Sequence, residues 1–103
     1  MRRVTVRYRV KPERVKENEA LVRAVYDELA RARPAGLRYA TVKLDDGVSF
    51  VHLASVETAD GHNPLSDLAA FREFQREIRD RCDQAPVVSE LSTIGSFRIF
   101  DDT

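Results

Sequence analysis

The distribution of apolar and polar residues changes period several times along the chain. It begins with an alternation of period two over residues 4–10, which is typical of a β-strand with one buried face. The apolar face is expected to carry Val4, Val6, Tyr8 and Val10, and the opposite face Thr5, Arg7 and Arg9.

A helical period follows this strand. The segment Lys11-Pro12-Glu13 is a typical helix start, because proline lacks the N–H that has no partner in the first turn and an acidic residue suits the positive end of the helix dipole. The helix is expected to end before Pro34-Ala35-Gly36. Its apolar stripe, with a spacing of three to four, contains Val15, Val22, Val25, Tyr26 and Leu29.

Two more strands are predicted on either side of Asp46-Gly47, from Leu37 to Asp45 and from Val48 to Glu57. A two-residue Asp-Gly link is typical of a type I′ turn, in which both central residues have positive φ. The register that follows pairs Asp45 with Val48, Lys43 with Phe50, Thr41 with His52 and Tyr39 with Ala54. One face then carries Tyr39, Thr41, Lys43, Phe50, His52, Ala54 and Val56, and the other Ala40, Val42, Leu44, Val51 and Leu53.

A second helix is predicted after the polar loop from Thr58 to Asn63, with Asn63 or Ser66 as its cap. We expect Asp83-Gln84-Ala85-Pro86 to end this helix. A long last strand is predicted from Val87 to Phe100, where Gly95 marks a bulge or a bend. The apolar positions of the helix are Leu65, Leu68, Phe71, Phe74, Ile78 and Cys82, and the two phenylalanines are expected to pack on the sheet.

The order strand, helix, strand, strand, helix, strand predicts a single α+β domain over residues 1–103 with a ferredoxin-like fold. Right-handed crossovers place both helices on one face of a four-stranded antiparallel sheet, in the order 4-1-3-2. The hairpin carries apolar side chains on both faces, and two helices can cover only one. Since exposed apolar patches of this kind are usually covered, we expect a homodimer joined through the sheet faces.

Composition and charge narrow the function classes. The formal net charge is zero, so the sequence favours neither nucleic acid nor an anionic membrane as a partner. No apolar run approaches the roughly 20 residues of a membrane span, and the first residues lack the apolar region of a signal peptide. Cys82 is the only cysteine and therefore forms no internal disulfide. We expect a cytoplasmic protein whose cysteine is inert.

His52 is the first candidate for chemistry, because its unperturbed pKa lies near neutrality and it stands in the middle of a strand. It is either a general base or a core or interface histidine bonded to Thr41 or to a backbone carbonyl. His62 lies in the polar loop, either at the mouth of a pocket or simply in solvent. Two histidines without a third ligand make a poor metal site, and no phosphate loop or nucleophile elbow is present, so we expect neither metal nor cofactor.

Tyrosines and arginines supply further candidates. Tyr8, Tyr26 and Tyr39 are either amphipathic core residues or donors of a phenolic hydrogen bond to a ligand oxygen, with Tyr8 and Tyr39 the preferred ligand-binding candidates. Arg7 and Arg9 on the central strand either bind an anion or form ion pairs with Glu57 or Glu90 across a dimer interface.

Three segments carry a family resemblance: the first strand with Lys11-Pro12, the strand Phe50-Val51-His52-Leu53, and Phe71-Arg72-Glu73-Phe74. Over nearly its whole length the chain resembles the dimeric α+β barrel superfamily, and within it the small antibiotic-biosynthesis-monooxygenase-like proteins. The resemblance implies two sheets packed face to face, with a pocket between the sheet and helices of each subunit. The haem-degrading branch of that superfamily has an asparagine, a tryptophan and a histidine as a characteristic set of residues. This chain contains no tryptophan and so departs from the pattern of that branch.

Two functions remain open from the sequence. The first is a cofactor-independent oxygenase or isomerase acting on an aromatic or polyketide-like molecule, which predicts a cavity of about 300 Å³ or more that holds His52 and a tyrosine hydroxyl. The second is a non-enzymatic dimer that binds a small ligand or a partner protein, which predicts a filled core with every polar group satisfied.

Overall fold

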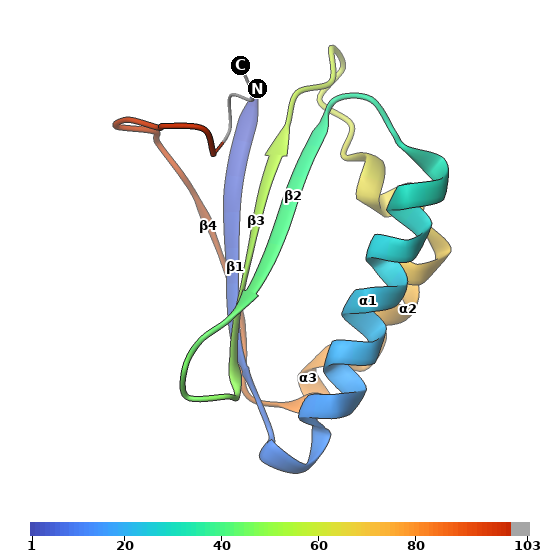
Figure 1. Cartoon of the computed structure of the whole chain (residues 1–103), viewed down its shortest axis with the longest axis vertical. Coiled ribbons are helices and arrows are strands. Elements are labelled where there is room, and N and C mark those ends of the chain that lie inside the picture. Colours follow the sequence, from blue (N-terminus) through green and yellow to red (C-terminus); the bar gives the residue numbers. More distant parts are fainter. Residues whose placement is uncertain (100–103) are drawn as a thin grey trace.

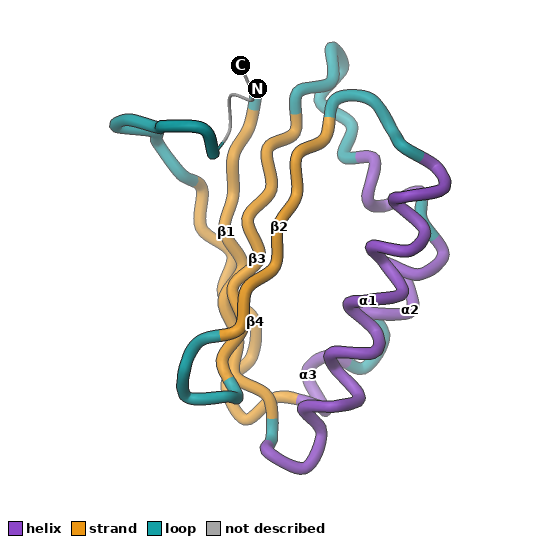
Figure 2. The backbone as a smooth tube through the Cα atoms, in the orientation of Figure 1, coloured by secondary structure: helices purple, strands orange, loops and turns teal. Residues whose placement is uncertain are grey.

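A computed structural model of the chain describes residues 1–99, which form an antiparallel sheet with helices on one face (Figure 1). The sheet order β2-β3-β1-β4 confirms the ferredoxin-like prediction. Figure 2 shows strands and helices as two separate layers, with one face of the sheet uncovered. The strands are β1 (Arg2–Val10), β2 (Leu37–Lys43), β3 (Ser49–Val56) and β4 (Cys82–Glu90), and the helical elements are η1 (Pro12–Arg14), α1 (Val15–Ala32), η2 (Pro64–Asp67), α2 (Ala69–Gln75) and α3 (Ile78–Arg81).

The hairpin of β2 and β3 has the predicted register but not the predicted turn. Thr41 pairs with His52 and Tyr39 with Ala54, as expected. The strands facing the turn stop at Lys43 and Ser49, however, so the predicted pair of Asp45 with Val48 is not formed. Gly47 has a φ of +77°, but Asp46 does not share the positive φ that a type I′ turn requires, so that prediction is wrong. The Asp46 carboxylate instead accepts hydrogen bonds from the N–H groups of Val48 and Ser49, at 2.9 and 2.8 Å, which stabilises a wider link between the strands.

The predicted second helix is broken into three pieces, η2, α2 and α3. The breaks fall at Leu68 and Arg76, whose backbones are extended, and at Glu77, whose φ is +61°. Arg81 explains the second break: its guanidinium donates to the carbonyls of Phe74 (2.7 Å) and Arg76 (3.1 Å), so the last carbonyls of α2 are bonded without a further turn of helix. The predicted cap is present, since Asn63 accepts the N–H of Leu65.

The last strand begins earlier and ends earlier than the sequence predicted. β4 starts at Cys82, so the expected helix stop at 83–86 lies within the strand, and Pro86 is tolerated because β4 is an edge strand. The strand ends at Glu90 because it pairs only with β1. The next residue, Leu91, still donates to the carbonyl of Arg3, but β1 itself begins at Arg2 and offers almost no further partners. Gly95 lies in an irregular segment rather than in a strand, and Phe100 lies outside the described residues.

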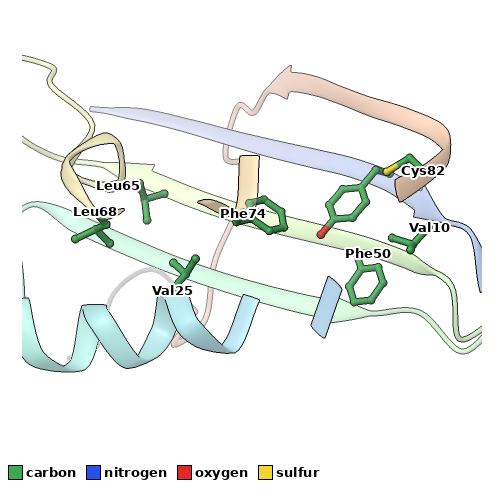
Figure 3. Close-up of a cluster of buried hydrophobic side chains, with 8 residues drawn as sticks. Val10, Val25, Phe50, Leu65, Leu68, Phe74 and Cys82 are labelled. Atoms are coloured by element: carbon green, nitrogen blue, oxygen red, sulfur yellow. The ribbon is translucent and has the colours of Figure 1, made fainter. Parts of the chain in front are cut away.

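The core lies between the sheet and the helices (Figure 3). It brings together side chains from β1, β3, α1 and the second helical region, and each large apolar side chain buried there stabilises the fold by about 1.5–3 kcal/mol. Burial in this core also raises the pKa of the Cys82 thiol, which therefore stays protonated. The core residues are Tyr8, Val10, Val25, Phe50, Leu65, Leu68, Phe74 and Cys82.

The opposite face of the sheet carries apolar side chains that no helix covers. Val42, Leu44 and Val87 are 47%, 41% and 56% exposed in the single chain. None of the helices within residues 1–99 is long and apolar enough to cross a membrane.

Candidate functional site

A cavity of about 330 Å³ opens between the helix-covered face of the sheet and the second helical region. Most of its wall is apolar, and its polar groups come from β2, β3, the loop before η2, α2 and α3. This composition, an apolar wall with a few polar groups, is typical of small-molecule sites. The cavity wall includes Tyr39, His52, Asn63, Phe71, Phe74 and Arg79.

His52 is held in this cavity by contacts at both nitrogens of its ring. Strand alternation turns it toward the helices, where it is only 4% exposed. The Tyr8 hydroxyl lies 2.7 Å from Nε2, and the Tyr39 hydroxyl lies 2.6 Å from Nδ1. The Thr41 hydroxyl is a second neighbour of Nδ1, at 3.1 Å. The ring is therefore clamped between hydroxyl groups from β1 and β2.

Burial sets the protonation of these groups. It lowers the pKa of His52 to about 4, because the charged imidazolium would lose its hydration in this apolar surrounding. It raises the pKa values of the Tyr8 and Tyr39 hydroxyls well above the ordinary value, chiefly because a buried phenolate would be desolvated. At neutral pH the site thus contains a neutral imidazole and two protonated phenols.

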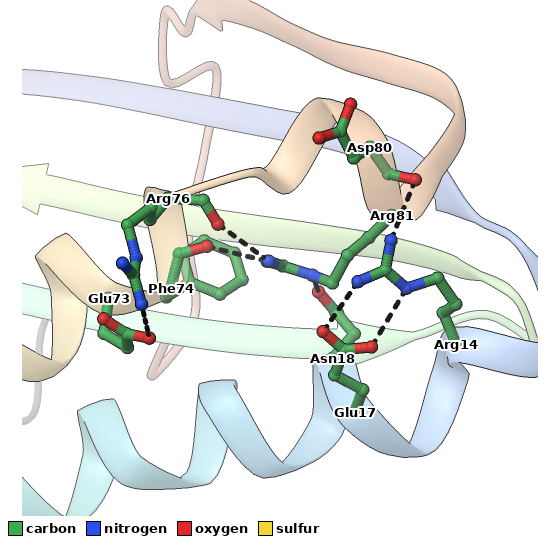
Figure 4. Close-up of polar contacts among 8 residues, drawn as sticks. All are labelled: Arg14, Glu17, Asn18, Glu73, Phe74, Arg76, Asp80 and Arg81. Carbon is green, nitrogen blue, oxygen red and sulfur yellow. Dashed lines mark hydrogen bonds and ion pairs between the residues drawn. The ribbon is translucent and has the colours of Figure 1, made fainter.

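A chain of polar contacts continues from Tyr8 into the helical layer. Asn18 of α1, which has no exposed surface, donates through Nδ2 to the Tyr8 hydroxyl at 3.0 Å. Arg81 of α3, only 1% exposed, donates through Nε to Oδ1 of Asn18 at 3.2 Å. Figure 4 shows Arg81 reaching Asn18 on one side and the backbone carbonyls of Phe74 and Arg76 on the other. Arg81 therefore joins the cap of α2 to the site.

At the other end of this chain of polar contacts, the Tyr26 hydroxyl lies 2.8 Å from the Thr41 hydroxyl. The ring of Tyr26 stacks on the ring of Tyr39. No buried side-chain nitrogen or oxygen within residues 1–99 lacks a hydrogen-bond partner. The side chains that run from Tyr26 through His52 to Arg81 thus form one connected network through the core, and the network is stable because each of its members is satisfied.

The structure brings together three of the four residues that the sequence singled out. His52, Tyr8 and Tyr39 are in contact, although Tyr8 lies behind His52 rather than in the cavity wall. His62 lies apart, in the exposed loop, where its Nε2 is 2.9 Å from the Asp67 carboxylate. The alternative of a histidine bonded to Thr41 agrees with the structure as far as that contact goes.

Sequence reasoning missed Asn18 and Arg81 and gave Asn63 only its capping role. A signal for Asn18 was present, since it falls in the apolar stripe of the first helix, between Val15 and Val22. Arg81 gave no comparable signal, because its place in the fold depends on the break between α2 and α3. Asn63 both caps η2 and lines the cavity.

Most arginines of the sheet form ion pairs within the chain. Arg9 pairs with Asp83 at 2.7 Å. Arg7 is exposed and forms no ion pair or side-chain hydrogen bond with the other residues of 1–99. Glu90 pairs with Arg2 at 2.9 Å, and Glu57 lies near Arg3 and Arg38. Within the described part of the chain no cluster of three acidic, histidine or cysteine side chains is placed to hold a metal ion.

Solved structures share this fold. A crystal structure described as an antibiotic biosynthesis monooxygenase superposes with a TM-score of 0.74 at 18% identity, covering 92% of this chain and all of the other. A protein from Nitrosomonas europaea, described as a putative antibiotic biosynthesis monooxygenase, superposes with a TM-score of 0.75 at 15% identity and with the same coverage of both chains. A mutant of SnoaB, described as a cofactor-independent oxygenase from Streptomyces nogalater, gives 0.67 at 15% identity over 92% of this chain and 94% of its own.

No protein-family model matches the sequence, and no curated protein is significantly similar to it. The likeness to solved structures therefore lies in three dimensions. It shows that the chain has the α+β fold of the antibiotic biosynthesis monooxygenase structures, as the resemblance in the sequence implied.

Proposed function

We propose that this protein is a homodimeric, cofactor-independent monooxygenase-like enzyme that acts on an aromatic or polyketide-like small molecule. The observation that carries the proposal is the cavity of about 330 Å³ in which a neutral His52 and the Tyr39 hydroxyl meet a mostly apolar wall. This combination is the one that the oxygenase hypothesis predicted from the sequence. The fold shared with a structure described as a cofactor-independent oxygenase supports it.

In the proposed reaction the substrate and oxygen supply the redox chemistry. A hydroxylated substrate of the anthrone type, bound as its phenolate, gives electrons to O₂. The CH₂ between its aromatic rings becomes C=O, one oxygen atom enters the product, and the other leaves with the two hydrogens as water. The apolar wall excludes bulk water and the rings of Phe71 and Phe74 face the substrate. The Tyr39 hydroxyl, held by His52, stabilises negative charge on the substrate oxygen.

The groups at the edge of the cavity fit such a ligand. Arg79 lines the cavity and forms no ion pair or side-chain hydrogen bond with any other residue of 1–99. Its guanidinium is thus available to an acidic or carbonyl substituent of the ligand.

The uncovered face of the sheet supports the dimer. By strand alternation its exposed valine and leucine side chains lie on the face opposite the cavity, so a second copy packed there would cover them without blocking the site.

A second candidate is a non-enzymatic dimer that binds a similar ligand. One observation favours it: both nitrogens of His52 already have hydroxyl partners, so the imidazole has no free lone pair to take a proton from a substrate. In this alternative the same cavity and the same Tyr39 donor hold the ligand, and no oxygen is consumed.

The test measures binding and oxygen uptake with the same probe, a dihydroxyanthrone, in metal-free buffer. Tyr39→Phe removes the hydroxyl in the cavity, and His62→Gln is the control, because His62 lies in the exposed loop beside Asp67 and is not part of the cavity wall. Oxygen uptake that is lost in Tyr39→Phe and kept in His62→Gln supports the enzyme. Binding without uptake supports the second candidate, and no binding contradicts both.

A further inference from the structure

The hydrogen bonds around His52 have a direction, and that direction begins at Arg81. A guanidinium carries only donors, so each of its three hydrogen bonds must be made to an acceptor. Two of these acceptors are backbone carbonyls, and the third is the side chain of Asn18, at 3.2 Å from Nε. The Asn18 atom that faces Arg81 must therefore be the carbonyl oxygen.

This fixes the orientation of the Asn18 amide. With its oxygen bound to Arg81, the NH₂ group faces Tyr8 and donates to the phenol oxygen, at 3.0 Å. Asn18 has no exposed surface and Arg81 is 1% exposed, so water offers neither group another partner. An inverted amide would place NH₂ against guanidinium and leave both without an acceptor.

The amide in turn fixes the Tyr8 hydroxyl. Its oxygen accepts from Asn18, and its single hydrogen needs an acceptor in the core, where Tyr8 is 2% exposed. The acceptor within reach is Nε2 of His52, at 2.7 Å. Because burial holds His52 neutral, only one ring nitrogen carries hydrogen, so Nε2 is the acceptor and Nδ1 the donor.

Nδ1 then donates to the Tyr39 oxygen, at 2.6 Å, in preference to the Thr41 hydroxyl at 3.1 Å. The Tyr39 hydrogen is left to point at Thr41 or into the cavity. Thr41 keeps the Tyr26 hydroxyl as a partner at 2.8 Å, so Tyr39 can turn its hydrogen to a ligand without leaving Thr41 unbonded.

We propose that Arg81 and Asn18 are positioning residues that fix His52 as its Nδ1–H tautomer and thereby make the Tyr39 hydroxyl a hydrogen-bond donor to the cavity. The site consequently selects ligands that place an acceptor oxygen, a carbonyl or a phenolate, against Tyr39. The ligand preference rests on the proposed function, whereas the tautomer is a property of the free protein.

The tautomer is tested by two-bond ¹H–¹⁵N correlation NMR on protein labelled at histidine. The chain has two histidines, and His62→Gln identifies the signals of His52. We expect His52 to show a protonated Nδ1 and an unprotonated Nε2 at neutral pH. A protonated Nε2, or rapid exchange between the two tautomers, overturns the proposal before any variant is made.

Asn18→Asp is the decisive variant, because it is nearly isosteric and its carboxylate still pairs with Arg81. A carboxylate has no donor, so the Tyr8 hydrogen must turn toward it, and the Tyr8 oxygen must accept from His52. We expect the tautomer to invert to Nε2–H. His62→Gln, whose exposed side chain lies outside this chain of contacts, keeps Nδ1–H. An Asn18→Asp protein that folds and keeps Nδ1–H contradicts the proposal. If it does not fold, Asn18→Ala replaces it; alanine donates nothing to Tyr8, so an unchanged, fixed Nδ1–H tautomer there contradicts the proposal equally.

The ligand preference is tested with fluorenone and fluorene, which have similar shapes but differ in one carbonyl acceptor. We expect the wild-type protein to bind fluorenone about tenfold more tightly, the value of one buried hydrogen bond. The preference should disappear in Tyr39→Phe and in Asn18→Asp, where Tyr39 donates to Nδ1 instead. Equal binding of both probes by a protein with the Nδ1–H tautomer contradicts the ligand preference and leaves the positioning role standing; failure to bind either probe counts against the proposed function itself.

Discussion

Tyr39 and His52 are diagonal neighbours on one face of a hairpin. Tyr39 pairs with Ala54 and His52 with Thr41, yet the Tyr39 hydroxyl and Nδ1 of His52 lie 2.6 Å apart. A diagonal pair on adjacent strands is within reach of long aromatic side chains. The closest contact of the site is therefore made within a single local element, before any helix packs on it.

Removing the imidazole should destabilise the protein. In His52→Ala the Tyr8 hydrogen loses its acceptor and Tyr39 its donor within the core, so we expect the free energy of unfolding to fall by at least about 1–3 kcal/mol. His52→Gln keeps polar atoms at this position, so its free energy of unfolding should fall by less than that of His52→Ala. Urea denaturation of both variants provides the comparison. If His52→Ala is as stable as the wild type, the network contributes nothing to stability and the histidine is retained for ligand chemistry alone.

Stability should decrease with acidification because of the same side chain. The folded pKa of His52 is about 4, below the ordinary 6.5, so the unfolded chain binds the proton first as the pH falls. The folded state is therefore favoured as long as His52 is neutral in the unfolded chain too. This contribution to the free energy of unfolding is complete above about pH 6.5, is lost progressively toward pH 4, and amounts to about 3 kcal/mol in total. His52→Gln should remove this part of the pH dependence. Unfolding near pH 7.5 and near pH 5 tests it, and parallel curves for the two proteins would disprove the pKa shift.

The assembly should be a dimer through the uncovered sheet face. Light scattering after size exclusion is expected to give about twice the chain mass of 11.7 kDa at micromolar concentration. Val42→Asp places a charge on that face and should shift the protein toward a monomer, while Ala24→Asp on the exposed side of α1 should not. A wild-type monomer would refute the dimer, and a dimer insensitive to Val42→Asp would place the interface elsewhere.

Two glycines with nearly the same backbone angle offer a matched test of close packing. Gly36 and Gly47 have φ of +78° and +77°, but a Cβ on Gly36 would meet Thr58 at 2.7 Å, whereas one on Gly47 meets nothing within 4 Å. Gly47→Ala should therefore destabilise by about 1 kcal/mol through backbone strain alone. Gly36→Ala should lose more stability than Gly47→Ala, and thermal unfolding of the two variants measures the difference. Equal losses of stability would show that Thr58 moves aside.

The sequence predicted the sheet well because its signals are local. Strand alternation and the Asp46-Gly47 link were enough to place His52 opposite Thr41 and on the same face as Tyr39. The turn type was nevertheless wrong, since it depends on the hydrogen bonds of the Asp46 carboxylate and not on the dipeptide alone. The register was correct because the link has the same total length in either turn.

The second helical region was less predictable, and so was the inner half of the site. The apolar spacing from Leu65 to Cys82 fits one helix, and only the fold-back of Arg81 onto the Phe74 carbonyl explains why the chain breaks. Arg81 and Asn18 meet across 63 positions of sequence, in a contact that requires α1 and α3 to be packed already. A polar residue on the apolar stripe was the only local sign of this contact.

The buried position of Cys82 has a practical consequence for studying the cavity. As the chain's only thiol it is shielded and protonated, so alkylating dyes should leave the native protein unmodified. An introduced cysteine would then be the single reactive site without any background to remove. Placed by Arg79→Cys at the cavity wall, it could carry a fluorophore whose emission reports each ligand as it enters.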